Sequence, residues 1–357
     1  MIQHLAALSV HAFYAGELDA GRRSCERLLS LPGLPQEMEM QTRVNRTFYT
    51  QPLEELAGCR FVRLDVEPAQ PGWSCFNPTI ADCGGLVAVV RSSNYRIVDG
   101  RYVMPPEDGD TIRTQNLLVR LRPDLTVADC RPIAGPEYHR TEYPVDGLED
   151  CRLRQTQAGI GVSATVRDAA PLNGDCRIGI ADLDVDRAEF TGLRMLDCLS
   201  LQQHEKNWMP LQGCDGWVYA VSHAGHTVTV DADPSLRGAY LMHRRSPAPQ
   251  IGSQFRGGSQ LVQFRGGWLG LIHEVAHGGH RVYEHRWVWL DNSLTLKRWS
   301  LPFAFRELRT IEFAAGLAIT GSSVVASFGV RDAEAWLVDL DAGSVEGMLA
   351  DAAPADR

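Results

Sequence analysis

The 357-residue sequence has no long apolar run, no cluster of basic residues and no closely paired cysteines. No window approaches the roughly 20 apolar residues of a membrane-spanning helix, so we expect no membrane span. The net charge of −9, with no run of Lys and Arg, argues against nucleic-acid binding, which needs a basic face. The nine cysteines never form C-x-x-C, and the first residues lack the pattern of a signal peptide. We therefore expect reduced thiols and a cytoplasmic location.

The first 52 residues differ from the rest in the spacing of their apolar residues. Leu5, Leu8 and Ala12 recur at helical spacing, as do Cys25 and Leu28, and a glycine turn separates the two runs. Residues 35–53 are compatible with a third helix. The pattern A-x-x-x-x-Y-A-G-E-x-x-x-G resembles one tetratricopeptide-type hairpin, and such arrays normally need about three units to bury their faces. We therefore expect this segment to pack on the following domain or on a protein partner.

Residues 57–345 consist of short apolar runs separated by Gly, Asp and Asn turns, among them GLVAVVRSS, GIGVSATVRD, GWVYAVSHA and EAWLVDLD. Many runs are rich in β-branched or aromatic residues, and none shows a helical period. Turn signals roughly every 10 to 15 residues predict an all-β sandwich, barrel or propeller, and the recurrent Gly-Trp and Gly-Leu strand starts favour a propeller. The Pro-, Ala- and Asp-rich tail, 346–357, is expected to be frayed.

The stretch His273-Glu274-Val275-Ala276-His277 matches the zinc-protease pattern H-E-x-x-H. That site needs both histidines on one face of a helix. Here a strand-like run precedes the pattern, and Gly278 and Gly279 follow it, each costing about 1 kcal/mol relative to alanine in a helix. An alternating run, RVYEHRWVWLD, then resumes, so we predict a β-hairpin. On a strand the histidines would lie about 13 Å apart, too far for one zinc ion, and we expect neither a zinc protease nor a metal site.

Several short segments, in order, resemble the five-bladed β-propeller family of β-mannoside phosphorylases and mannosidases, together with the related mannosyltransferases. The matching segments are FNPTI (76–80), VVRSS (89–93), GLEDCRL (147–153), HEKNWMPL (204–211), GWLGLIHEV (267–275), and IEFAAGL with ASFGVRD within 311–332. Cys151 departs from the family, which usually has proline in E-D-P-R. The strand YEHRWVWLD departs as well, so the segments indicate a divergent branch.

Transfer of a sugar to phosphate needs only one carboxylic acid, because phosphate is already an anionic nucleophile, but it needs cationic and hydroxyl groups to hold the phosphate. The resemblance implies Asp150 as the single proton donor, Lys206, His273, Tyr283 and Arg152 as phosphate contacts, and Asn77, Arg91, Asn207 and Asp332 as substrate contacts. It implies no cofactor, since inorganic phosphate or a sugar-phosphate donor is itself a substrate, and it implies an oligosaccharide or glycan as the binding partner.

Asp150 and Arg152 stand two residues apart on an expected strand and hence on one face, where the guanidinium would lower the carboxyl pKa. A general acid needs the opposite shift. Either bound phosphate neutralises Arg152, or the proton is delivered indirectly, and the resemblance implies delivery through a substrate hydroxyl. Purely structural roles stay open as well: a solvated turn at Asp150, an exposed loop pair at Lys206-Asn207, core or cross-strand packing for His273 and Tyr283, and a turn cap at Asp332.

The leading hypothesis is an inverting carbohydrate-active enzyme on a five-bladed β-propeller, with a helical segment over residues 1–52, the propeller over 57–345 and the tail over 346–357. It would transfer a glycosyl group, with mannosyl as the first choice, between an oligosaccharide and phosphate. Two alternatives stay open. One is a glycosyltransferase that uses a sugar nucleotide, and the other is a non-catalytic glycan-binding or scaffold propeller.

Overall fold

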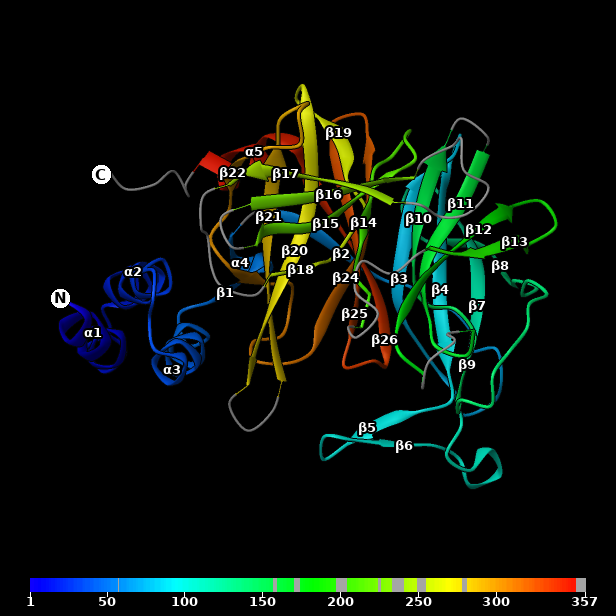
Figure 1. Cartoon of the computed structure of the whole chain (residues 1–357), viewed down its shortest axis with the longest axis horizontal. Coiled ribbons are helices and arrows are strands. Elements are labelled where there is room, and N and C mark those ends of the chain that lie inside the picture. Colours follow the sequence, from blue (N-terminus) through cyan, green and yellow to red (C-terminus); the bar gives the residue numbers. More distant parts are fainter. Residues whose placement is uncertain are drawn as a thin grey trace.

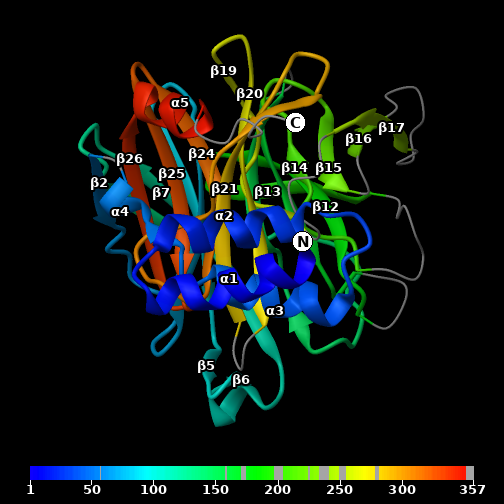
Figure 2. The same cartoon turned by 90° about the vertical axis from the view of Figure 1, so that its left-hand side faces the viewer.

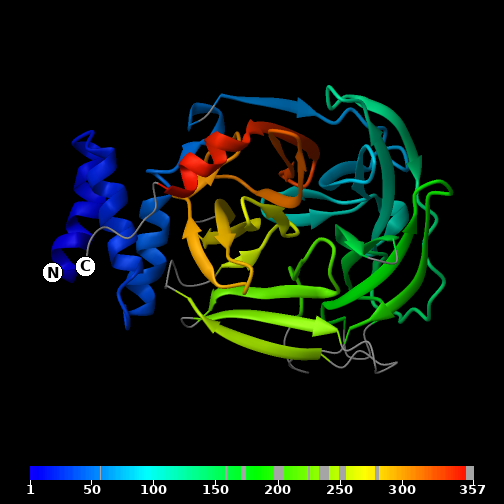
Figure 3. The same ribbon diagram turned by 90° about the horizontal axis from the view of Figure 1, so that it is seen from above.

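The computed structural model describes residues 1–56, 58–156, 159–169, 174–196, 204–223, 226–232, 241–248, 255–277 and 281–350. Within these ranges the chain is mostly β, with a helical segment at its N-terminal end (Figure 1). The sheets stand side by side around a common axis in a propeller-like arrangement (Figure 3). The predicted all-β class with N-terminal helices is confirmed at this level. No helix among these residues is both long and apolar enough to cross a membrane.

The described strands form five sheets of four or more strands and one separate hairpin. The first sheet contains β3 (Ser74–Asp82), β4 (Leu86–Ser93), β7 (Ile112–Leu121), β8 (Val127–Pro132) and β9 (Val145–Asp146). The second contains β10 (Glu149–Thr156), β11 (Gly159–Val166), β12 (Arg177–Asp184) and β13 (Glu189–Met195). The third contains β14 (Met209–Pro210), β15 (Gly216–His223), β16 (His226–Ala232) and β17 (Leu241–Pro247).

The fourth sheet contains β1 (Gln51–Pro52), β18 (Arg256–Gly257), β19 (Val262–Phe264), β20 (Gly267–His277), β21 (Arg281–Leu290), β22 (Leu296–Trp299) and β23 (Phe303–Ala304). The fifth contains β2 (Cys59–Arg63), β24 (Glu312–Thr320), β25 (Ser323–Val330) and β26 (Glu334–Asp341). The separate hairpin pairs β5 (Arg96–Val98) with β6 (Arg101–Val103), and a 3-10 turn (Pro106–Asp108) follows it.

The fifth sheet joins the two ends of the β-domain. Strand β2 pairs antiparallel with β26, from Cys59 opposite Leu340 to Arg63 opposite Trp336. A strand from the beginning of the domain is therefore hydrogen-bonded to its last strand, which pairs on both sides and has no free edge.

Buried polar side chains link the sheets to one another. The fully buried Gln260 amide donates to Ile80 O (2.6 Å) and Leu317 O (2.7 Å), and its oxygen accepts from Leu317 N. Thr79 Oγ1 accepts from Leu153 N at 3.0 Å. Because buried polar groups must be paired, these bonds fix the first, second and fifth sheets relative to one another.

The helical segment consists of α1 (Ile2–Tyr14), α2 (Leu18–Leu29) and α3 (Gln36–Arg46), and it covers the outer side of the fourth sheet (Figure 2). Its joint with that sheet is a buried ion cluster. Arg46, 1% exposed, binds Glu274 on β20 and Glu284 on β21, and Arg286 binds Glu26 at 2.8 Å. The expectation that this segment packs on the following domain is confirmed.

Two predicted boundaries are wrong. Residues 346–350 are not frayed, because they complete the helix α5 (Ala342–Ala350), which buries Val345 and Leu349 in the core. Residues 51 and 52 already belong to the β-domain, since β1 pairs with β23, and the short helix α4 (Leu53–Leu56) follows. The remaining tail, 351–357, lies outside the described residues.

Candidate active site

Asp150 lies at the centre of a cluster formed by the first two sheets. Its Oδ1 accepts hydrogen bonds from Asn77 Nδ2 on β3 (2.9 Å) and from Arg91 Nη1 on β4 (3.1 Å). The other end of the Arg91 guanidinium binds the carboxylate of Glu149. Arg91 itself is 4% exposed and lies over the rings of Phe76 and Tyr95. Three residues that the sequence predicted as neighbours are therefore in direct contact.

The backbone of this cluster is strained. Asn77, Asp150, Asn207 and Asp332 all have positive φ, at 47°, 48°, 63° and 50°. The pairing register shifts between Phe76 and Thr79 in β3 and between Glu149 and Arg152 in β10. Non-glycine residues in the left-handed region cost about 1–3 kcal/mol each, and such residues and β-bulges gather at functional sites. Four of the nine predicted site residues carry this signature.

Arg152 lowers the pKa of the Asp150 carboxyl group, as expected, but its hydrogen bond with Asp150 is to the backbone. The bulge between Glu149 and Arg152 interrupts the regular alternation on which the shared face was predicted. Arg91 and Asn77, not Arg152, bind the Asp150 carboxylate, whereas Arg152 donates to the backbone oxygen of Asp150 at 3.2 Å. Asp150 is also not a lone acid, because Glu149 shares its arginine.

Arg152 is a buried cation without a carboxylate partner among the described residues. Its side chain is 1% exposed and donates to Gly258 O (2.5 Å) and Asn207 Oδ1 (3.1 Å), which are both neutral. Burial lowers its pKa to about 10, against the opposing charge of Asp150. A buried charge that lacks an ion-pair partner is costly, so this position is suited to receive an anion.

The predicted hairpin around His273 is confirmed. Strands β20 and β21 pair antiparallel, with His273 opposite His285, so the H-E-x-x-H pattern lies on a strand and lacks the helix that a zincin site requires. Among the described residues no group of three His, Cys, Asp or Glu side chains could hold a metal ion.

His273 is a buried, neutral imidazole. Its ring stacks on Tyr283 at 5.2 Å and meets the edge of Phe313. Burial, together with the nearby His285, Arg256, Arg152 and Lys206, holds its pKa well below the ordinary value. Nδ1 has no hydrogen-bond partner among the described residues. A ligand that offered a donor or acceptor here would satisfy this atom.

Lys206, which is exposed, belongs to the same electrostatic neighbourhood. Burial raises the pKa of the Cys176 thiol, and Lys206, Glu149 and Asp150 are among the charges that act on that thiol. Arg256 stands opposite His273 in the β18–β20 register. Three cationic side chains, of Arg152, Lys206 and Arg256, therefore act on His273.

The two aspartates have opposite pKa shifts. Burial alone would raise the pKa of Asp150, but Arg91, Asn77 and Arg152 together hold it below its ordinary value. Burial and the charge of Asp150 raise the pKa of Asp332 to about 6, against Arg91, a hydrogen bond from Tyr95 (2.9 Å) and Arg281. Asp150 is thus ionised near neutral pH, and Asp332 is the carboxyl group closer to its titration range.

Sequence reasoning missed Tyr95 and Glu149. Tyr95 follows the predicted strand of Arg91 by only a few residues, and Glu149 directly precedes Asp150, so proximity to matched segments was the available signal. Neither residue showed in the sequence that it would contact Arg91, because these contacts depend on the bulge at β10 and on the chain path after β4.

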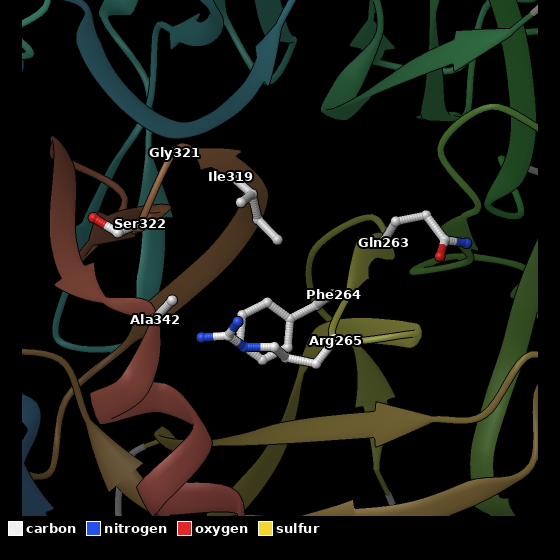
Figure 4. A pocket seen from close by; sticks show the side chains of 7 residues that line it. All are labelled: Gln263, Phe264, Arg265, Ile319, Gly321, Ser322 and Ala342. Carbon is white, nitrogen blue, oxygen red and sulfur yellow. The ribbon is translucent and has the colours of Figure 1, made fainter.

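A separate hollow of about 340 Å³ lies elsewhere in the fold, lined by Gln263, Phe264, Arg265, Ile319, Gly321, Ser322 and Ala342 (Figure 4). It lies beside α5, at the turn that joins β24 to β25. Asp332 follows the opposite end of β25. None of the predicted site residues lines it.

No protein-family model matches the chain, and no curated protein matches it in sequence. Solved structures do match. A β-1,2-mannobiose phosphorylase from Listeria innocua matches with a TM-score of 0.53 and 13% identity, over 82% of this chain and 97% of that one. A structure from a family of mannoside phosphorylases that contains glycoside hydrolases targeting β-1,2-mannosidic linkages in Candida mannan matches with a TM-score of 0.56 and 12% identity, over 82% and 96%.

A mannose phosphorylase from Leishmania mexicana, solved in complex with phosphate ion, matches with a TM-score of 0.50 and 12% identity, over 81% of this chain and 90% of that one. In each case nearly the whole of the solved chain is covered, so the likeness extends far beyond one supersecondary unit. At this level of identity, the chain shares the fold of the mannoside phosphorylases and hydrolases.

Proposed function

We propose that the protein is a carbohydrate-active enzyme that transfers a glycosyl group, with mannosyl as the first choice, between a glycan and phosphate or a phosphate-linked donor. One observation carries the proposal: a strained, hydrogen-bonded cluster of Asn77, Arg91 and Asp150 lies beside the buried guanidinium of Arg152, which has no carboxylate partner in the described part of the chain. The shared fold favours mannosides as the first substrates to test.

The cationic part of the site is suited to bind phosphate. Arg152 would gain the anionic partner that it lacks, and the exposed ammonium of Lys206 and the guanidinium of Arg256 would add charge from the solvent side. The neutral imidazole of His273 and the Tyr283 hydroxyl offer hydrogen bonds without a further buried charge. Charge-assisted hydrogen bonds of this kind are about twice as strong as neutral ones.

The two aspartates have different roles in the transfer. In an inverting transfer, a phosphate oxygen forms a bond to the anomeric carbon, the glycosidic C–O bond breaks, and the leaving oxygen takes one proton. We assign that proton to Asp332, whose pKa is raised to about 6. Asp150 stays the catalytic carboxylate that accepts hydrogen bonds from sugar hydroxyls. Environments that push two carboxyl pKa values apart commonly separate an acid from a base.

We also infer that the five larger sheets are the five blades of one propeller. The pairing of β2 with β26 supports a closed ring, and the order of the sheets follows the chain. The first two sheets contribute the Asp150 cluster and the fourth contributes His273 and Tyr283, which fits a site at one end of the ring axis.

The proposal is tested by incubating the protein with mannosides and inorganic phosphate and analysing the products for sugar 1-phosphate. Asp150→Asn and Asp332→Asn should each lower turnover by at least about 100-fold, as expected for loss of a group in acid–base catalysis. Asp110→Asn, an exposed residue, is the matched control and should retain full activity.

Two outcomes would contradict the proposal. The first is the absence of turnover across a broad panel of mannosides and phosphate. The second is turnover that Asp150→Asn and Asp332→Asn leave unchanged. Turnover that requires a sugar nucleotide and ignores phosphate would replace the phosphorylase by a glycosyltransferase. Glycan binding without any turnover would leave the non-catalytic alternative.

A further inference from the structure

The hairpin β5–β6 is separate from every sheet of the ring, since its two strands pair only with each other. Figures 1 and 2 show it projecting from the same end of the molecule as the lower ends of β20 and β21. It exposes three large apolar side chains, of Val98 (50%), Tyr102 (45%) and Val103 (49%). An isolated two-stranded hairpin is marginally stable in water, so exposed apolar residues on it call for a functional reason.

Tyr102 is connected to the candidate acid through one residue. Tyr95, 4% exposed, donates its hydroxyl hydrogen bond to Asp332 at 2.9 Å. The ring of Tyr95 meets that of Tyr102 edge-to-face, with centroids 5.0 Å apart at 88°. Tyr95 also packs on Phe76, next to Asn77. The exposed face of Tyr102 is therefore held by residues that contact the site.

Tyr102 is also connected to Tyr283 and His273, two of the candidate phosphate contacts. Arg281, the first residue of β21, interacts by charge and by hydrogen bonds with the hydroxyls of both Tyr102 and Tyr283. The Tyr283 ring stacks on His273 at 5.2 Å. Arg281 thus links Tyr102, which contacts Tyr95 on the Asp332 side, with Tyr283 on the His273 side.

We propose that Tyr102 and Arg281 form a sugar-binding platform for a residue of the glycan beyond the one that reacts, which makes an oligosaccharide of three or more sugars the preferred substrate. This inference rests on the proposed function. Sugars present apolar C–H faces and rims of hydroxyl groups, which suit an exposed tyrosine ring and a guanidinium with five donors. Tyr102 reaches the site through its contact with Tyr95, and two side chains are far fewer than the roughly 20 to 30 residues that each partner contributes to a stable protein interface.

The test measures glycan binding directly, by calorimetry with a series of β-1,2-mannooligosaccharides of two to five sugars, and turnover of the same series in parallel. Wild-type protein should bind the longer members more tightly than the disaccharide. Tyr102→Ala should weaken binding of the longer members by about tenfold and leave the disaccharide unchanged. Tyr102→Phe keeps the aromatic ring, so its affinity for the longer members should fall less than that of Tyr102→Ala. Tyr14→Ala, an 82% exposed tyrosine on α1, is the matched control.

Equal affinity of the wild type for short and long glycans would overturn the platform. So would a Tyr102→Ala variant that loses as much affinity for the disaccharide as for the longer glycans, because that result would indicate a structural role. Length-dependent binding without turnover would support the platform and overturn the proposed enzyme. Turnover that Tyr102→Ala leaves unchanged at every glycan length would overturn the platform and support the proposed enzyme. Failure of the wild type to bind any member would overturn both.

Discussion

At the residue scale, Asp332 determines a pH dependence that can be measured without a substrate. Its pKa in the folded protein is raised to about 6, because burial and the charge of Asp150 disfavour its ionised form. An aspartate in the unfolded chain has a pKa of about 3.9. The folded state therefore binds this proton more tightly, so the stability contributed by protonation is complete below about pH 4 and is lost as the pH rises through about 6.

Asp332→Asn has no such proton to lose. Relative to the wild type, its unfolding free energy should therefore rise between pH 4 and pH 7, by on the order of 2 kcal/mol. Urea unfolding at several pH values measures this difference. The exposed Asp110→Asn should show no comparable trend. A difference between Asp332→Asn and wild type that is constant over this pH range would contradict the assignment.

Gly329 on β25 keeps Asn77 in place. A Cβ at this buried position would overlap Asn77 Oδ1 and the Asn77 backbone nitrogen. Gly329→Ala should therefore displace the amide that binds Asp150 and lower turnover by about 100-fold, since misplacing a catalytic group by about 1 Å can have that effect.

The control for Gly329→Ala is Gly347→Ala on α5, where a Cβ would meet nothing within 4 Å. It should leave turnover unchanged and slightly raise the melting temperature, because alanine favours a helix more than glycine does. Equal turnover of wild type and Gly329→Ala, with both proteins folded, would show that Asn77 does not position Asp150.

The individual site residues could be predicted from the sequence only through resemblance. Asn77, Arg91 and Asp150 lie in three segments that matched the family in order, and the structure brings them into contact. Spacing predicted the influence of Arg152 on the Asp150 carboxyl group but not its hydrogen bond to the Asp150 backbone, because the bulge in β10 cannot be read from the residues EDCRL. The lowered pKa of Asp150 was expected from Arg152, but the raised pKa of Asp332 could not be predicted, since a pKa depends on neighbours distant in sequence.

At the element scale, the hairpin β20–β21 joins the helices to the site. Its side chains alternate, so Glu274 and Glu284 face α3 and bind Arg46, while His273 and Tyr283 point to the opposite face. The same alternation explains why the H-E-x-x-H pattern is not a zinc site. The helical segment thereby supports the strand pair that carries the candidate phosphate contacts.

Arg46→Ala tests this joint. It would leave Glu274 and Glu284 as buried carboxylates without their cation, which typically costs about 3–5 kcal/mol. Urea unfolding should show this loss, and phosphate affinity should fall with it because His273 lies on the same strand as Glu274. Arg22→Ala, which removes only a surface pair with Asp19, should cost less than about 1 kcal/mol. Costs of similar size in the two variants would contradict the role of the cluster.

Elements with strong local signals could be predicted, and those fixed by tertiary contacts could not. The helices around Leu5 and Leu28 and the hairpin after His273 followed from period and glycine turns. Helix α5 was missed because the compositional bias of the tail hid Val345 and Leu349, which only the assembled core buries. The tetratricopeptide resemblance of the helices stays a prediction.

At the scale of the whole molecule, the pairing of β2 with β26 brings the beginning of the β-domain against its last strand. The alternation of short strands and turns was sufficient to predict a β-domain with a sandwich, barrel or propeller plan, but not how its sheets associate. The likeness to the solved β-1,2-mannobiose phosphorylase covers 82% of the chain.

The central claim is that a phosphate-sized anion binds beside Arg152, and calorimetric titration with inorganic phosphate tests it most directly. We predict saturable binding to one site of the wild type, at least tenfold weaker binding to Arg152→Gln and Lys206→Gln, and unchanged binding to Arg60→Gln, a surface arginine paired with Asp339. The account is contradicted if the wild type shows no saturable binding, or if all three variants, verified as folded by their thermal unfolding, bind phosphate with the affinity of the wild type.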